Sequence, residues 1–171
     1  MRRLDVVLVT VIAVLAALLL VIRPRASAPP SPHCRGGPPL AGVYHSPRLE
    51  VRKRCAVASG IVTRVKFEEF DGDVHVDLRL DPGYEHLLSD GNDRVGGNLL
   101  VEVIPFDRAR VAVPEEGARV EVVGPWVQDD QHGWNEIHPA WWVSGGRVQP
   151  ASAAELRAVQ MLLQTNASDS Q

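Results

Sequence analysis

The sequence predicts a mainly β fold with one apolar helix before the β region and one amphipathic helix after it. Residues 73–81 alternate polar and apolar side chains without a fault, which is the period of a half-buried strand. Further runs rich in Val and Ile, bounded by Gly, Pro and Asp, indicate additional strands. Residues 152–164 then change to helical periodicity, with one apolar stripe and a Ser152–Glu155 capping box.

The amino terminus predicts a membrane-spanning helix. Residues 6–22 are apolar except for Thr10, and Arg residues flank them on both sides. This length is at the short end of a spanning helix and longer than the usual apolar core of a cleaved signal peptide. We therefore predict an uncleaved signal anchor. The alternative is secretion after cleavage near residues 26–28, where Ala-Ser-Ala resembles a cleavage site.

The two cysteines, Cys34 and Cys55, indicate the compartment. Two Cys in a domain outside the membrane favour one disulfide, which predicts that the globular part is extracytoplasmic. Pro-rich sequence before the domain predicts a spacer. The predicted organisation is an anchor, a spacer, a β-barrel domain, a helix and a disordered tail: residues 1–23, 24–42, 43–150, 151–164 and 165–171.

Five strands are expected in the globular part, at residues 56–67, 73–81, 98–104, 119–127 and 134–143. Gly60 lies where a bulge would let the long first strand coil sharply, and Asp71-Gly72 is a hairpin signal. The third strand is apolar on both faces, which predicts a central position. Together with the longer connection after the third strand, these features predict a five-stranded OB-like Greek-key barrel with a C-terminal helix, preceded by the N-terminal transmembrane helix.

Two motifs carry a resemblance to a known group of proteins. Gly72-Asp73-Val74-His75-Val76-Asp77-Leu78 and His132-Gly133-Trp134-Asn135-Glu136-Ile137-His138-Pro139 resemble a family of bacterial extracytoplasmic OB-fold domains with an HGWxEIHP motif. The resemblance covers about residues 55–143. It implies a fold and a compartment, and it implies no activity.

The stretch from residue 129 to residue 142 concentrates Trp, His and carboxylates, and it is the first candidate for a site. Imidazole and carboxylate groups are ligands for zinc or another divalent metal, so a metal site is one hypothesis. Its candidate ligands are Asp130, His132, Glu136 and His138. A possible second polar face consists of Asp73, His75 and Asp77, which the alternation of the second strand directs outward. Because strands two and five are separated in an OB barrel, a site shared by both sets is not favoured.

The alternative interpretation of this stretch is structural. Glu136 can accept a hydrogen bond from an imidazole or an indole N–H, and buried Trp and His side chains normally find such partners. The four tryptophans are then expected to be structural aromatics: Trp126, Trp134, Trp141 and Trp142. No hydrolase or nucleotide-binding signature is present in the sequence, so we predict no enzyme and no cofactor unless the metal hypothesis holds.

Charge argues against a nucleic-acid partner. Residues 33–150 contain 13 Lys plus Arg against 18 Asp plus Glu, a net charge of −5, and phosphate binding requires a basic groove. The one basic run, residues 48–54, is interpreted as a solvated edge or a membrane-surface contact. The sequence therefore predicts a membrane-anchored binding or interaction module of the cell envelope with a protein or small-ligand partner. A divalent-metal protein is the first alternative, and a single-strand nucleic-acid binder is the second.

Overall fold

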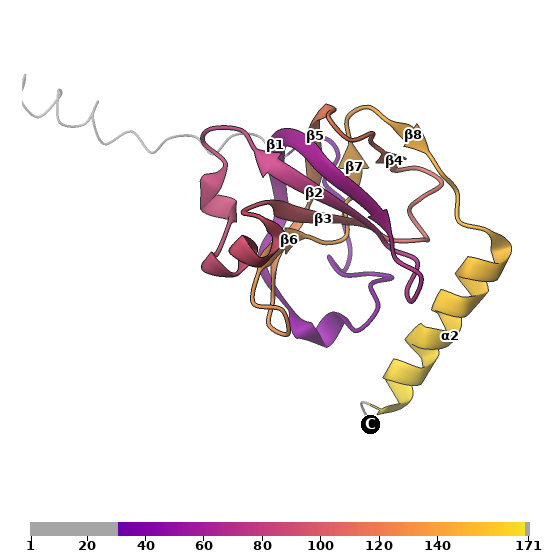
Figure 1. Ribbon diagram of the computed structural model, residues 1–171. Coiled ribbons are helices and arrows are strands. Elements are labelled where there is room, and N and C mark those ends of the chain that lie inside the picture. Colours follow the sequence, from indigo (N-terminus) through magenta and orange to yellow (C-terminus); the bar gives the residue numbers. More distant parts are fainter. Residues whose placement is uncertain (1–30, 170–171) are drawn as a thin grey trace, which may run out of the picture.

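A computed structural model describes residues 31–169 of the chain, with side chains described to residue 165 (Figure 1). The predicted anchor at residues 1–23 lies outside the described residues. None of the helices in the described part is long and apolar enough to cross a membrane. The described part is mainly β, with a helix at its carboxyl end, as the sequence predicts.

Five strands form a ring-like sheet, in which each strand is hydrogen-bonded to two neighbours. They are β1 (Leu49–Phe67), β2 (Val74–Leu80), β3 (Leu99–Val103), β5 (Arg119–Asp129) and β6 (Asn135–Ile137). The order is β1-β2-β3-β6-β5, and β5 returns to β1. The β3–β6 pair is parallel and the other pairs are antiparallel.

The long strand β1 closes the ring because it serves two partners. Its first part pairs with β5 and its second part with β2, and Gly60 is opposite a residue of each. A Cβ at Gly60 would lie 2.3 Å from the carbonyl oxygen of Arg79, so only glycine allows this close approach. The break in the β1–β2 register lies between Val62 and Arg64, just after the glycine where we expected a bulge.

The inner face of the ring is apolar. Alternate residues of the strands point inward, and the main core includes Val74, Val76, Leu99, Val101 and Ile137, each at most 1% exposed. Removing this surface from water is the main force that holds the ring closed. Every residue of β3 is buried, in agreement with its predicted central position.

The predicted fifth strand is shorter than expected. Residues 134–143 divide into β6 and a second short strand, β7 (Trp142–Val143), which pairs with β5. Pro139 lies between them, and its missing N–H cannot take part in a ladder. A small second sheet, which the sequence did not predict, joins β4 (Ala112–Val113) to β8 (Arg147–Val148).

The part of the predicted spacer that the structure describes lies against the ring. The predicted Cys34–Cys55 disulfide is present, and it joins this segment to β1. The Arg35 guanidinium donates hydrogen bonds to Asp107 Oδ2 at 2.5 Å and to the Trp141 carbonyl at 2.9 Å. Residues 31–42 are therefore attached to the globular part by a covalent bond and by polar contacts.

Helix α2 (Ala153–Asp169) begins at the predicted capping box. Ser152 N donates to Glu155 Oε2 at 2.6 Å, and Glu155 N donates to Ser152 Oγ at 3.2 Å. Arg108 also donates to Glu155 at 2.8 Å, which ties the first turn to the globular part. The helix continues beyond residue 164, where we expected it to end and a disordered tail to begin.

Three 3-10 helices complete the described part: η1 (Ser46–Arg48), η2 (Glu85–Leu87) and η3 (Asp90–Val95). The latter two lie in the polar connection between β2 and β3. η1 immediately precedes β1, and its last residue, Arg48, contacts Asp129 and Glu136.

Candidate functional site

Polar side chains from three segments meet on the outer face of the ring, beside β2, β3 and β6. Asp73 precedes β2, Glu102 belongs to β3, Glu136 belongs to β6, and His138 follows β6. All four are buried: Asp73 and Glu102 are 3% exposed, Glu136 is 1% exposed, and His138 is 0% exposed. We name these four residues the His138 cluster.

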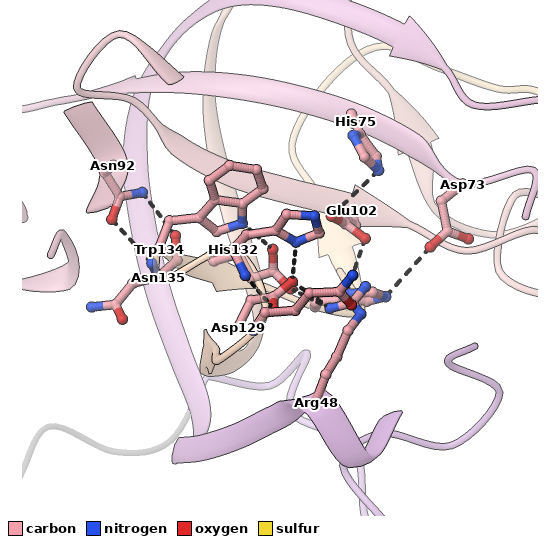
Figure 2. Close-up of polar contacts among 12 residues, drawn as sticks. Arg48, Asp73, His75, Asn92, Glu102, Asp129, His132, Trp134 and Asn135 are labelled. Atoms are coloured by element: carbon pink, nitrogen blue, oxygen red, sulfur yellow. Dashed lines mark hydrogen bonds and ion pairs between the residues drawn. The ribbon is translucent and has the colours of Figure 1, made fainter. Parts of the chain in front are cut away.

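The imidazole of His138 is the centre of the cluster. Its Nδ1 lies 3.1 Å from Glu136 Oε1 and 2.9 Å from Glu102 Oε2. Its Nε2 lies 3.4 Å from Asp73 Oδ2. Figure 2 labels two of these carboxylates, Asp73 and Glu102.

The backbone around His138 explains why this side chain reaches the cluster. His138 N donates to the Pro125 carbonyl at 3.1 Å, and Ala140 N donates to the Glu102 carbonyl at 2.7 Å. Residues 138–140 are thus held between β5 and β3. A Cβ at Gly124 would lie 2.5 Å from the Pro139 carbonyl oxygen, so glycine in β5 is required for this approach.

The electrostatics of the cluster favour a charged imidazole. Burial alone would lower the pKa of His138, but the charge of Glu102 and the contacts with Asp73, Glu102 and Glu136 raise it well above its usual value. Burial raises the pKa of Glu102, an effect that the neighbouring His138 opposes. The two groups share one buried environment, so the protonation of each depends on the other.

A second group of polar contacts adjoins the cluster. Asp129 Oδ2 lies 2.6 Å from His132 Nδ1 and 2.6 Å from the Arg48 guanidinium. Asp129 Oδ1 accepts hydrogen bonds from Gln131 N at 2.8 Å and His132 N at 3.0 Å. Burial tends to raise the pKa of Asp129, but the hydrogen bonds with His132 and the charge of Arg48 lower it overall. Arg48 also lies 3.8 Å from Glu136, which connects the two groups.

Trp134 joins the turn at residues 130–134 to the cluster. Its indole N–H donates to Glu136 Oε2 at 3.0 Å, and its ring stacks on His132 with 4.5 Å between centroids. Glu136 therefore contacts both an indole and an imidazole, one through each carboxylate oxygen. The stacked pair lies at the upper part of the close-up in Figure 2.

Helix η3 braces the same turn. The buried Asn92 donates to the Asn98 carbonyl at 2.8 Å and to the Asn135 carbonyl at 2.9 Å, and it accepts from Asn135 N at 3.0 Å. Arg94 donates to the His132 carbonyl at 2.7 Å. A Cβ at Gly91 would lie 1.9 Å from the Gly133 carbonyl oxygen, so η3 and the turn are in direct backbone contact.

A pocket of about 340 Å³ opens beside the cluster, between the loop at residues 68–73 and the turn at residues 130–134. Its lining comes from β1, β2, β3, both of these segments, η1 and η3: Arg48, Arg64, Lys66, Glu68, Phe70, Asp71, His75, Val95, Leu100, Glu102, His132 and Trp134. We name it the outer pocket. Glu102 belongs both to its wall and to the His138 cluster.

Most of the charges in the outer pocket have partners. Lys66 lies 2.6 Å from Glu68. His75 lies 3.4 Å from Glu68 and 3.3 Å from Glu102. Arg64 lies 2.9 Å from Asp77, outside the pocket wall. The pocket thus presents cations and anions side by side rather than a basic track.

The four predicted metal ligands do not gather in one place. Glu136 and His138 are together in the buried cluster, whereas His132 contacts Asp129 at the pocket wall. Asp130 is exposed, because the buried Asp129 ends β5 and the next residue points outward.

The second predicted polar face is divided as well. Asp73 and Asp77 are only 3% and 6% exposed, because other side chains cover this outer face of the ring. Asp73 is covered by His138, and Asp77 pairs with Arg64. His75 is half-buried and lines the outer pocket. The predicted second and fifth strands correspond to β2 and β6. The ring does bring residues of both into one site, because β3 lies between them and contributes Glu102.

Sequence reasoning missed Glu102, Asp129 and Arg48. Glu102 had a signal: it is the one charged residue in an apolar strand predicted to be central, and a buried carboxylate requires a partner. The sequence around Arg48 gave no signal for a site, because Arg48 begins a basic run that we interpreted as a solvated edge or membrane contact.

No family model matches the chain, and a search of curated proteins finds none with significant similarity. The class is therefore defined by the structure itself. The chain is a disulfide-bonded, mainly β protein with a ring-like sheet of five strands and a polar pocket on the outer face of that sheet.

Proposed function

We propose that this chain is an extracytoplasmic binding module of the cell envelope, built on an OB-type Greek-key barrel. The ring order supports the barrel assignment: the first strand is shared, and the long third connection precedes the fourth strand. The disulfide indicates an oxidising compartment. The apolar residues 6–22 would anchor the module in the membrane, or direct its secretion if they are cleaved.

The position of the outer pocket is the observation that carries this proposal. OB barrels bind their ligands on the face of strands two and three, between the first and the fourth loops. The outer pocket lies on β2 and β3, between the loop at residues 68–73 and the turn at residues 130–134. In OB terms these segments are the first and fourth loops.

The lining selects a small polar ligand or a polar side chain of a protein partner. A volume of about 340 Å³ is near the lower limit of small-molecule sites. Paired charges suit a ligand that has both donors and acceptors, such as an amino acid, a short peptide or a sugar. A single-strand nucleic acid would need a continuous basic groove with free stacking surfaces. Here His132 already covers one face of Trp134.

We propose no catalytic role for these residues. Their hydrogen bonds and ion pairs are directed at one another, and the sequence has no nucleophile motif beside them. We therefore propose a ligand-binding site rather than a catalytic site.

Ligand-observed NMR on the full-length chain in mild detergent tests the proposal. The panel contains amino acids, dipeptides, mono- and disaccharides, and a short oligothymidylate. Binding of one of the first three classes should be lost in Lys66→Ala and His132→Ala, which change the pocket wall. It should persist in Lys53→Ala, an exposed change on β1 outside that wall. The proposal would be refuted if a ligand bound both Lys66→Ala and His132→Ala as well as it binds the wild type, or if no compound of the panel bound.

A further inference from the structure

We propose that Asp73, Glu102 and His138 bind a divalent transition-metal ion and that Glu136 orients the imidazole for it. This site differs from the one predicted from the sequence, since only His138 is a ligand in both. It also goes beyond the proposed function, because ligand binding in the outer pocket does not require it.

The three side chains are close enough to share one ion. One ring nitrogen of His138 and one carboxylate oxygen each from Asp73 and Glu102 all lie within 4.8 Å of one another. All three residues are buried. The distance of 3.4 Å between His138 Nε2 and Asp73 Oδ2 is roughly that between two ligands of a tetrahedral ion with bonds of about 2.1 Å.

The hydrogen bonding of His138 points to a cation beside Nε2. A carboxylate can only accept, so the contact with Glu136 places a proton on Nδ1. Nε2 then faces Asp73 Oδ2, and neither atom makes a hydrogen bond. A lone pair on Nε2 would repel this oxygen, and an N–H there would lie 3.4 Å from it, farther than in an ordinary hydrogen bond. A metal ion between the two atoms satisfies both.

Glu102 has the same kind of unsatisfied atom. Its Oε2 is buried without a hydrogen bond, although it lies 2.9 Å from His138 Nδ1. Each of the three proposed ligands thus contributes one buried polar atom that the protein leaves without a hydrogen bond. Buried polar atoms of native proteins are seldom left in this state, except where a water or an ion completes them.

The charge count also favours a cation. Three buried carboxylates, those of Asp73, Glu102 and Glu136, surround a single imidazole. Arg48 lies 3.8 Å from Glu136 but only 2.6 Å from Asp129, so its positive charge mainly neutralises the carboxylate of Asp129. Excess buried charge is costly, and an ion with two positive charges would offset two of these three negative charges.

The donor set selects the type of metal. One imidazole with carboxylates, and no thiolate, suits Zn²⁺ or Mn²⁺ more than Ca²⁺, which prefers oxygen ligands only. Glu136 would act as the carboxylate that holds the Nδ1–H of a metal-bound histidine. The ion would enter through the outer pocket, whose wall includes Glu102.

The test uses the full-length chain in mild detergent, stripped with chelator and titrated with Zn²⁺, Mn²⁺ or Ca²⁺. Elemental analysis after desalting should find one Zn²⁺ or Mn²⁺ per chain and no retained Ca²⁺. Asp73→Asn and Glu102→Gln should abolish retention. Asp77→Asn should not, because Asp77 is a buried carboxylate of β2 that pairs with Arg64 outside the cluster. Glu136→Gln should weaken the affinity by roughly 10–100-fold.

A second measurement tests the imidazole itself without a substitution that could unfold the protein. Side-chain ¹⁵N NMR of the wild-type chain should show that His138 keeps the proton on Nδ1 when Zn²⁺ is added, whereas Nε2 loses any proton that it carries and its resonance shifts. No metal retention by wild type, with protons on both ring nitrogens, would overturn the proposal and leave His138 as an imidazolium in a structural ion-pair network. Repeating the ligand panel on stripped protein separates the two proposals, since pocket binding should remain there.

Discussion

Glu136 receives the indole of Trp134 on one carboxylate oxygen and the imidazole of His138 on the other, at 3.0 and 3.1 Å. The three residues alternate along β6 and its flanks, so they share one face of the strand. Glu136 thereby connects the pocket wall, through Trp134, to the buried cluster, through His138.

Glu136→Ala should lower the free energy of unfolding by about 3–5 kcal/mol, because it leaves a buried imidazole without one of its charged partners. Chemical denaturation in the presence of chelator measures this loss without a contribution from metal. Glu121→Ala, at an exposed position of β5, is the matched control and should change stability by no more than about 0.5 kcal/mol. Equal effects of the two substitutions would contradict a central role for Glu136.

Asn92→Ala should loosen the turn at residues 130–134. The substitution removes both donors to the Asn98 and Asn135 carbonyls and the acceptor of Asn135 N. Because these buried groups are then unpaired, the free energy of unfolding should fall by at least about 2 kcal/mol. Hydrogen exchange of the Asn135 amide provides a local measurement, and its protection should fall further than that of core amides in β3. In Asn98→Ala, which removes only a side-chain bond to Val95, this amide should stay protected.

The disulfide should contribute to stability through the unfolded chain. Cys34 and Cys55 are separated by 21 residues, and closing such a loop is worth about 3 kcal/mol in the chain-entropy model. The Cys34→Ser/Cys55→Ser double variant should lose about this amount in denaturant titrations. Adding dithiothreitol should destabilise the wild type and leave the double variant unchanged. A variant as stable as oxidised wild type would show that Arg35 and its hydrogen bonds hold the segment unaided.

The start of α2 should resist acid to a low pH. Hydrogen bonds with Ser152 and then with Arg108 lower the pKa of Glu155 from 4.5 to about 2. Because the folded value lies below the unfolded one, the stabilisation is fully present above about pH 4.5 and is lost as the pH falls through about 2. A carboxyl ¹³C NMR titration should therefore give a midpoint near the lower value. Arg108→Ala should raise this midpoint, and a wild-type midpoint near 4.5 would contradict the capping-box geometry.

Patterns of short range predicted much of this fold. The alternation of residues 73–81 identified β2 and the side chains that it buries in the core, because a strand repeats every two residues. The Ser152–Glu155 box identified the start of α2, because its hydrogen bonds join residues three positions apart. The basic run before Cys55, in contrast, became the first part of β1, since the ladder to β5 extends to Leu49.

The site depended on contacts of long range. Asp129 rather than Asp130 meets His132, and which of two adjacent carboxylates points inward depends on where β5 ends. Glu102 could be suspected as a charge within an apolar strand, but its partner could not be named. Arg48 reaches Asp129 across 81 positions, a distance that no local pattern spans.

The sequence by itself determined the strand periodicity, the capped terminal helix and the pairing of its two cysteines, because each follows from near neighbours or from the only pair available. The tertiary structure alone decided that Asp73, Glu102, Glu136 and His138 form one buried cluster. These residues belong to segments that meet only when the ring closes, with the parallel β3–β6 pair placing Glu136 beside Leu100. Local sequence encodes the face on which each side chain lies, whereas the order and register of the strands decide which faces meet.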